Sequence, residues 1–195
     1  GLLGLFAPQV ARAAGVYATG IDIDDRRFQQ ARDFGAMATL DPRDERTTET
    51  VLALTDGFGA DAVILTVFTE SSEPLNHSFD LCRQRGCVVG LGAFGMEITR
   101  ERMYLRDVTF HPALAYGPGR YDRVYEEGGV DFAIGYVRWA ENRNMAAFLR
   151  LVAEGKIDVD SLAPVRIPIE RAPEAYALLR TAERPPTVLL TYPEA

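Results

Sequence analysis

The strongest constraint on this chain is the distance between two glycines at its start and an acidic residue further on. Gly1 and Gly4 enclose two leucines and precede an alanine-rich, helix-prone run that ends at Ala14. A β-branched and aromatic run then leads to Asp22, about 20 residues after Gly1. This order matches the last four positions of the pattern G-x-G-x-x-G, followed by a second strand with an acid at its tip. The spacing therefore predicts a dinucleotide-binding α/β fold whose first strand and first glycine are not in the chain.

The rest of the chain alternates between short apolar runs and helix-prone segments, which is typical of a parallel sheet with helical connections. We expect strands over residues 16–22, 37–40, 61–67, 86–91 and 107–114, helices over 44–55 and 74–84, and another helix that Asp24 caps and Gly35 ends. The strand at 61–67 is an unbroken apolar run, which predicts that both of its faces are covered. The predicted fold class is α/β: a Rossmann-like, doubly wound parallel sheet that lacks its first strand.

Composition divides the chain into three parts. Residues 1–115 are the expected dinucleotide-binding domain, truncated at its N-terminus. Residues 116–144 are rich in Tyr, Gly and Arg and lack a clear period, so we interpret them as an ordered arm, too aromatic for a flexible linker. Residues 145–195 complete the unit with a C-terminal helix-strand-helix-strand segment. Its expected elements are a helix with Met145, Phe148, Leu149 and Val152 on one face, a strand over 162–169, a helix opened by Pro173 and a strand over 187–192.

The absent first strand has a structural consequence. In the usual strand order 3-2-1-4-5-6 it lies at the centre of the sheet, between the strand that ends at Asp22 and the strand 61–67. Two apolar strand edges would be unpaired without it. We therefore expect this chain to be a fragment of a longer polypeptide, or to take the strand from a partner. Pro8 lies inside the first helix, where it removes one hydrogen bond and is expected to introduce a kink.

Two groups of residues are candidates for contact with the cofactor. Gly1 and Gly4 would let the backbone approach a pyrophosphate, while Leu2 and Leu3 would supply N–H donors at the positive end of a helix. Asp22 would accept hydrogen bonds from the ribose hydroxyls. The second group follows the carboxyl ends of two strands, with Thr66, Val67 and Phe68 on the adenosine side and Gly90, Leu91 and Gly92 near the nicotinamide. Packing and turn formation explain this second group equally well.

Asp22 also indicates which dinucleotide is preferred. Its carboxylate would repel a 2′-phosphate, so NAD is favoured over NADP. Arg26 and Arg27 keep NADP open as the alternative.

Composition disfavours several classes of partner and site. The formal net charge is −7 without any basic block, which argues against nucleic acid and anionic membranes. No apolar run approaches the ~18 residues of a membrane span. Two cysteines, Cys82 and Cys87, favour a reducing compartment, so we expect a cytoplasmic protein. His77 and His111 have no Cys or acid at metal-ligand spacing, so both are interpreted as satisfied structural histidines and no metal site is expected.

Nearly the whole chain resembles the cofactor-binding half of medium-chain, zinc-type alcohol and polyol dehydrogenases. The resemblance is carried by GLLGLFAPQVARAAG, TGIDIDDRRFQQARDFGA, FGADAVILTV, GCVVGLG and RIPIERAPEAY, in the family's order and spacing. The arm, with YGPGRYDRVYEEGGVDF and IGYVRWAENRNMAAFL, is similar to the branch in which this unit is fused to an inositol-dehydrogenase-like oxidoreductase domain. Ala113, Ala115 and the pair Pro164-Val165 depart from that branch, which carries serines and a Thr-His pair there.

The resemblance implies hydride transfer between NAD and a small-molecule alcohol, polyol or ketone, with a zinc ion that polarises the substrate oxygen. It also implies that the zinc ligands belong to an N-terminal catalytic domain outside this chain. We therefore assign no catalytic and no metal residue here. Self-association into a homo-oligomer is left open.

Two other functions stay open. One is a non-catalytic Rossmann-fold interaction module that docks through the arm, whose Tyr, Trp and Arg side chains are the types that anchor interfaces. These are Tyr116, Arg120, Tyr121, Tyr125, Tyr136, Arg138, Trp139 and Arg143. The same side chains are also suited to packing the arm onto its own domain. The other is a zinc-independent, quinone-reductase-like enzyme, which differs only in the absent domain.

Overall fold

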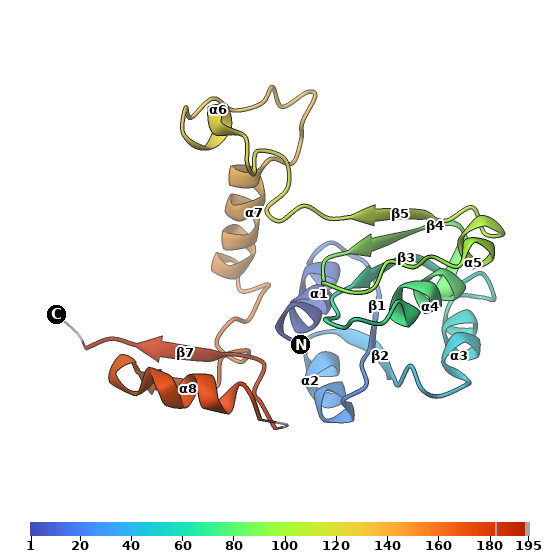
Figure 1. Cartoon of the computed structure of the whole chain (residues 1–195), viewed down its shortest axis with the longest axis horizontal. Coiled ribbons are helices and arrows are strands. Elements are labelled where there is room, and N and C mark those ends of the chain that lie inside the picture. Colours follow the sequence, from blue (N-terminus) through green and yellow to red (C-terminus); the bar gives the residue numbers. More distant parts are fainter. Residues whose placement is uncertain (182, 194–195) are drawn as a thin grey trace. The chain divides into compact units, whose positions relative to one another are not determined.

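The computed structural model describes residues 1–181 and 183–193, so the last two residues of the predicted segment 145–195 lie outside the described residues, as does position 182. The chain divides into two compact units (Figure 1). Residues 1–39 and 150–195 make up the terminal unit, and residues 40–149 make up the central unit. The terminal unit is therefore built from both ends of the sequence, whereas the three-part division by composition stays a prediction.

The N-terminal part of the terminal unit alternates between helices and strands in the predicted order. Its elements are α1 (Leu2–Ala13), β1 (Ala18–Ile21), the 3-10 turn η1 (Asp25–Arg27), α2 (Phe28–Asp33) and β2 (Ala36–Leu40). β1 and β2 form a two-stranded sheet. α1 continues through the buried Pro8, so this residue does not end the helix. Gly35 follows α2 at φ +107°, a conformation that side chains other than that of glycine rarely adopt.

One hydrophobic core holds this part together and draws on both ends of the chain. Leu5 on α1, Ala31 on α2 and Ala36 on β2 are buried against Phe34. Leu162, from the C-terminal part, joins the same cluster and is almost completely buried. The chain's last 40 residues therefore contribute to the core of its first 40.

The C-terminal part contains a second helix and strand pair. Its elements are β6 (Val165–Pro168), the 3-10 turn η2 (Ile169–Arg171), α8 (Ala172–Leu178) and β7 (Val188–Thr191). β6 and β7 run parallel, with Val165 opposite Val188. A proline in the first turn of α8 bears out the expected helix start, because proline costs no hydrogen bond at that position.

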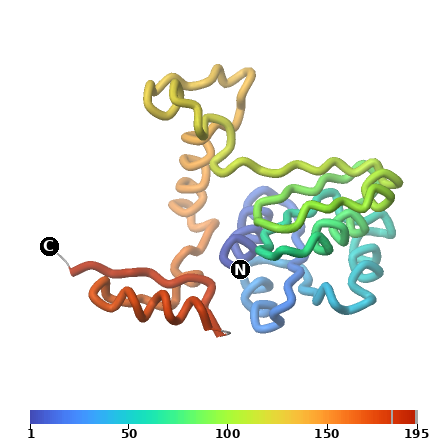
Figure 2. Tube along the Cα trace, in the orientation of Figure 1, coloured from blue at the N-terminus to red at the C-terminus, as the bar shows by residue number. Residues whose placement is uncertain are grey.

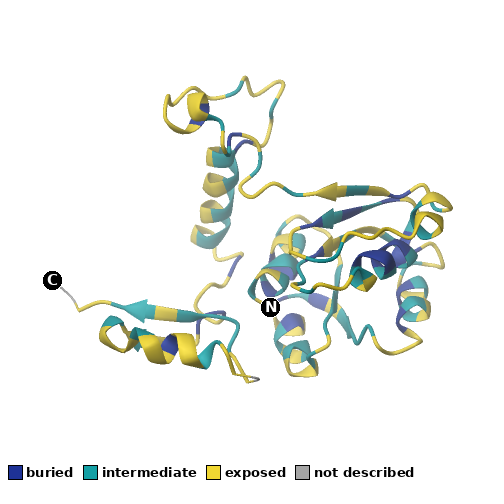
Figure 3. Cartoon of the chain, viewed as in Figure 1, coloured by how far each residue is buried: buried dark blue, intermediate teal, exposed yellow. Residues whose placement is uncertain are grey.

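The central unit is a three-stranded parallel sheet with short helices. Its elements are α3 (Thr47–Leu54), β3 (Ala60–Leu65), α4 (Glu73–Leu81), β4 (Cys82–Gly90), α5 (Arg100–Tyr104) and β5 (Thr109–Pro112). The strand order is β3-β4-β5, and both pairs are parallel, as predicted. Leu75 and Phe79 on α4 are completely buried against Leu65 and Val88 of the sheet. In Figure 3, much of α4 has the colour of buried residues.

The prediction that both faces of β3 are covered is wrong. Side chains alternate between the two faces of a strand. Val63 and Leu65 point toward the core with α4, whereas Ala62 and Ile64 are exposed, with Ile64 at 52%. β3 is also an edge strand, because among the described residues it pairs only with β4. An apolar run is therefore no proof of two covered faces.

The boundary between α4 and β4 also differs from the prediction. The helix ends at Leu81, and residues 82–84, expected to be helical, already belong to the strand. The register explains the early start: Ala60 pairs with Cys82 and Ala62 with Cys87, so the intervening residues form a bulge. Such a bulge leaves no periodic pattern in the sequence. α5 was not predicted either, because five residues are too few to show a helical period.

The predicted arm is mostly irregular, as expected. Figure 2 shows loops between β5 and the next long helix, interrupted by the short α6 (Arg123–Glu126). The long helix α7 (Glu141–Ala153) includes the last four residues of the predicted arm and is followed by Gly155 at φ +66°. None of its residues is buried, so its apolar face, including Met145 and Leu149, is exposed.

Candidate functional site

The N-terminus of α1 has the features of an anion site. Leu5 donates the first helical hydrogen bond to the carbonyl of Gly1 at 3.0 Å, so the amides of Leu2, Leu3 and Gly4 precede the helical ladder. Among the described residues no side chain caps this end, and the first turn carries no acid. Free amides and the helix dipole favour an anion such as a phosphate.

Asp22 lies beside this helix end, immediately after β1. Its Oδ2 is 3.5 Å from the amino nitrogen of Gly1, and its Oδ1 accepts a hydrogen bond of 3.0 Å from the backbone N–H of Asp24. The half-buried carboxylate is thus held next to the helix end. The structure brings together the glycine turn and the acid that the sequence placed at the same site.

Asp24 does more than the capping role predicted for it. It caps η1 by accepting the backbone N–H of Arg26 at 3.3 Å. Its carboxylate also binds the Arg26 guanidinium through two hydrogen bonds, of 2.7 and 2.9 Å, and lies 3.4 Å from Nε of Arg27. The hydrogen bonds from the Arg26 side chain are the main reason that the pKa of Asp24 lies below its ordinary value. In the sequence, the only indication of this cluster is that Arg26 and Arg27 follow Asp24 by two and three residues.

The strand-end candidates lie together in the central unit. The N–H groups of Leu91 and Gly92 both donate to the carbonyl of Leu65, at 2.8 and 3.1 Å. Phe68 bridges to Ala93, so the segments after β3 and β4, with Thr66 and Val67 in the first of them, run side by side. The carboxyl ends of two strands therefore form one edge, where open α/β sheets bind ligands.

Packing favours glycine at both positions of this edge, more strictly at Gly92, where a Cβ would meet backbone, than at Gly90, where it would meet the tip of a side chain. A Cβ on Gly92 would lie 1.9 Å from the carbonyl oxygen of Val67, and one on Gly90 would lie 2.7 Å from the Phe94 ring. Phe68, by contrast, is 92% exposed. The alternative of turn formation thus accounts for the two glycines by itself, and their contact with a cofactor stays a prediction.

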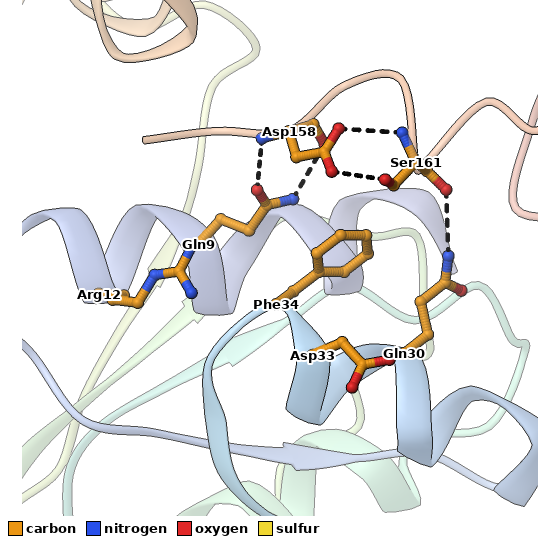
Figure 4. Close-up of a pocket in the computed structure, with 7 residues that line it drawn as sticks. All are labelled: Gln9, Arg12, Gln30, Asp33, Phe34, Asp158 and Ser161. Carbon is orange, nitrogen blue, oxygen red and sulfur yellow. Dashed lines mark hydrogen bonds between the residues drawn. The ribbon is translucent and has the colours of Figure 1, made fainter. Parts of the chain in front are cut away.

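A polar pocket of about 320 Å³ lies elsewhere in the terminal unit (Figure 4). The completely buried Gln9 accepts the backbone N–H of Asp158 at 2.7 Å and donates to its carbonyl at 3.3 Å. Ser161 bonds to the Asp158 carboxylate and accepts from Gln30 through its carbonyl. Gln9 is two helical turns from the phosphate end of α1, about 12 Å along the axis. The pocket is therefore distinct from the candidate cofactor site and ties residues 158–161 to α1.

The cysteines and histidines form no metal centre within the described part of the chain. Cys82 and Cys87 are free thiols, and burial raises the pKa of Cys82 to about 11, so it is an unreactive apolar residue. His77 contacts the hydroxyl of Thr48 at 3.2 Å, in keeping with a structural role. His111 is exposed on β5 and has no hydrogen-bond partner among described side chains, so it is not the satisfied histidine that was expected. Among the described helices, none has the length and apolar character to cross a membrane.

A family model for zinc-binding dehydrogenases matches residues 3–134. The chain belongs to this family. It corresponds to the cofactor-binding half of the medium-chain, zinc-type dehydrogenase superfamily, as the sequence resemblance implied.

Two curated dehydrogenases are among the proteins similar to this chain. D-arabitol-phosphate dehydrogenase from Enterococcus avium is 24% identical over 181 residues, covering 90% of this chain and 44% of that protein. Sorbitol dehydrogenase from Halalkalibacterium halodurans is 33% identical over 96 residues, covering 48% of this chain and 27% of that protein. The chain thus spans less than half the length of these relatives.

Solved structures of medium-chain dehydrogenases share the fold. An alcohol dehydrogenase from Thermus sp. ATN1 matches 99% of this chain and 50% of its own, with a TM-score of 0.72 at 23% identity. 2R,3R-butanediol dehydrogenase from Bacillus subtilis matches 100% and 49%, with a TM-score of 0.76 at 19% identity. A quinone oxidoreductase from Pseudomonas syringae pv. Tomato DC3000 matches 96% and 53%, with a TM-score of 0.67 at 23% identity.

Proposed function

We propose that this chain is the cofactor-binding part of an NAD-dependent dehydrogenase that transfers hydride between NAD(H) and an alcohol, polyol or ketone. The observation that carries the proposal is the placement of Asp22, whose carboxylate is 3.5 Å from the amino nitrogen of Gly1 at the N-terminus of α1. A phosphate-binding helix end and a ribose-binding acid side by side form the two polar contacts of a dinucleotide.

The residues present fit such a cofactor. A Cβ on Gly1 would meet no described atom within 4 Å, so the helix end offers room for a phosphate. The amides of Leu2, Leu3 and Gly4 would hold the pyrophosphate, and Asp22 would accept from the adenosine ribose. The cofactor would supply the hydride chemistry, while these residues bind and orient it. Because the Asp22 carboxylate would repel a 2′-phosphate, we propose NAD rather than NADP.

We propose that the substrate-binding site lies largely in a domain outside this chain. Family membership supports a zinc ion that polarises the substrate oxygen, held by a catalytic domain. We assign no catalytic and no metal residue to the residues described. We also propose a cytoplasmic location, supported by two free cysteines.

The test is a fluorescence titration of the 195-residue chain with NADH. Wild type should bind saturably, and Asp22→Ala should raise the dissociation constant at least about tenfold, because it removes charge-assisted hydrogen bonds to the ribose. Asp33→Ala is the matched control, because Asp33 is an exposed carboxylate on α2 whose described partner is Gln29. Circular dichroism checks that each variant folds. Equal affinities for wild type and Asp22→Ala would refute the proposed site.

A quinone-reductase-like enzyme is the second candidate, supported by the fold shared with the Pseudomonas syringae quinone oxidoreductase. Assays of the intact protein with an alcohol and with a quinone separate the two. Quinone reduction that persists after zinc removal would favour this candidate.

A docking module is the remaining candidate. An apolar hollow of about 320 Å³ is lined by Tyr116 and by four residues of α7, Asn144, Met145, Phe148 and Leu149. Within the arm itself, however, Tyr125 is buried and stacks on Phe132 at 5.2 Å, so part of the aromatic content packs internally. Loss of a bound partner in Trp139→Ala with NADH binding intact would favour docking; no such loss would count against it.

The arm's likeness to the fused branch also belongs to the proposal. Coding sequence that continues beyond Ala195 into an inositol-dehydrogenase-like domain would support it, and a stop codon there would count against it.

A further inference from the structure

Two arginines stand next to the proposed ribose acid, and a single carboxylate holds both of them. Arg26 places Nε 2.7 Å from Oδ1 of Asp24 and Nη2 2.9 Å from Oδ2. Arg27 places Nε 3.4 Å from Oδ2. Both oxygens of Asp24 are therefore engaged by guanidinium groups that directly follow the ribose-binding turn.

We propose that Asp24 determines which dinucleotide the site accepts, because it holds Arg26 and Arg27 in ion pairs that a cofactor 2′-phosphate would otherwise make. This inference rests on the proposed cofactor site. Arginines beside the ribose acid are the groups that accommodate the 2′-phosphate of NADP in dinucleotide-binding folds. In this chain both arginines are present, but each forms an ion pair with the Asp24 carboxylate.

Arg27 carries an unused donor at this point. Its side chain is only 14% exposed, and its Nη1 is buried without a hydrogen-bond partner among the described residues. A buried donor without a partner is unfavourable, so such a group gains from any acceptor that reaches it. An additional anion beside Asp22 would provide that acceptor once the competing carboxylate is removed.

The local charge explains why Asp24 decides the outcome. Residues 22–27 contain the three acids Asp22, Asp24 and Asp25 against the two arginines, a formal charge of −1. A phosphate monoester carries about −1.5 to −2 at neutral pH and is repelled by that turn. Replacing Asp24 by asparagine makes the turn neutral and removes the ion pairs that this carboxylate makes with Arg26 and Arg27. Asparagine also caps helical turns as well as aspartate, so η1 is preserved.

The experiment compares Asp24→Asn with Asp25→Asn in the 195-residue chain. Asp25 lies in the same turn, and its carboxylate makes no described hydrogen bond or salt bridge, so its replacement changes the charge equally without releasing either arginine. Fluorescence titrations with NADH and NADPH are paired with calorimetry of 5′-ADP and 2′,5′-ADP, which probe the phosphate subsite without the nicotinamide.

Asp24→Asn should bind NADPH and 2′,5′-ADP about five- to tenfold more tightly than wild type, the size expected for exposed charge-assisted contacts. NADH and 5′-ADP should change less than about twofold. Adding Arg27→Gln to Asp24→Asn should abolish the gain. Equal gains in Asp24→Asn and Asp25→Asn, or no gain in either, would overturn the inference.

The outcomes separate this inference from the proposed function. If wild type binds neither NADH nor 5′-ADP, the proposed site fails and the inference fails with it. If wild type binds NADH and Asp22→Ala does not, while Asp24→Asn shows no gain for NADPH, only the inference fails. Asp24→Ser, which keeps a capping oxygen without charge, provides the same measurement should the asparagine variant fold poorly.

Discussion

At the scale of single residues, the sequence located the candidate site better than it explained it. Gly1 and Asp22 were paired by spacing alone, and the structure brings them to within 3.5 Å. The ion pairs of Asp24 were not predicted, because a local sequence does not say which of several nearby charges will meet. Gly92 was a candidate for cofactor contact, yet the carbonyl of Val67 is sufficient reason for a glycine there.

Gly92→Ala is therefore expected to destabilise the central unit, by about 1–3 kcal/mol, as overpacking typically does. The new Cβ would lie 1.9 Å from the Val67 oxygen, so the turn after β3 or β4 has to move. Urea unfolding measures the loss. Gly135→Ala is the control, because a Cβ there meets no described atom within 4 Å and should leave stability nearly unchanged. Equal stability of Gly92→Ala and wild type would contradict the assignment.

At the scale of elements, the order of most helices and strands and the parallel pairing of β3, β4 and β5 could be predicted, but the register of the strands and the faces left exposed could not. Alternating periods were enough to find β1 to β5 and α7. The bulge that starts β4 at Cys82 depends on pairing with β3, which no local pattern records. Whether a face of β3 or of α7 is exposed likewise depends on which elements pack against it, and the local sequence does not show this.

Gln9 is an element-scale contact that the sequence also concealed, since a glutamine in a helix is usually on the surface. We expect Gln9→Leu to lower the free energy of unfolding by about 1–3 kcal/mol, because the backbone N–H and carbonyl of Asp158 lose their partners. Hydrogen exchange should accelerate at residues 158–163. Gln29→Leu, at an exposed position on α2, should have little effect on either measurement. Unchanged exchange in Gln9→Leu would disprove the anchoring role.

At the scale of the whole molecule, paired carboxylates set the response to acid. Neighbouring donors lower the pKa of several exposed or partly exposed acids, chiefly through hydrogen bonds. These are Asp24, Asp41, Asp44, Glu154, Asp158 and Glu174, and the side chain of Arg43 lowers the pKa of Asp41 to about 2. A group whose pKa is lower in the folded chain stabilises the fold above its unfolded pKa and loses that effect as pH falls through the folded value.

The melting temperature should therefore be nearly constant from pH 7 to about pH 5 and fall between about pH 4.5 and pH 2. Thermal melts followed by circular dichroism across this range measure it. Asp41→Asn should show a shallower fall, and 0.5 M salt should reduce the effect because exposed pairs are screened. A melting temperature that rises as the pH falls would have the wrong sign for this account.

The discontinuous terminal unit also sets an order of events during synthesis. Leu162 and Asp158 complete the core and the Gln9 anchor of a unit whose other residues, 1–39, are synthesised before the central unit. At a translation rate of roughly 5–20 residues per second, those first residues wait roughly 6–25 seconds for their partners. The central unit is continuous in sequence and has all its residues earlier. The helix that carries the candidate phosphate site is thus made before the central unit, and it gains its C-terminal partners only after that unit has been synthesised.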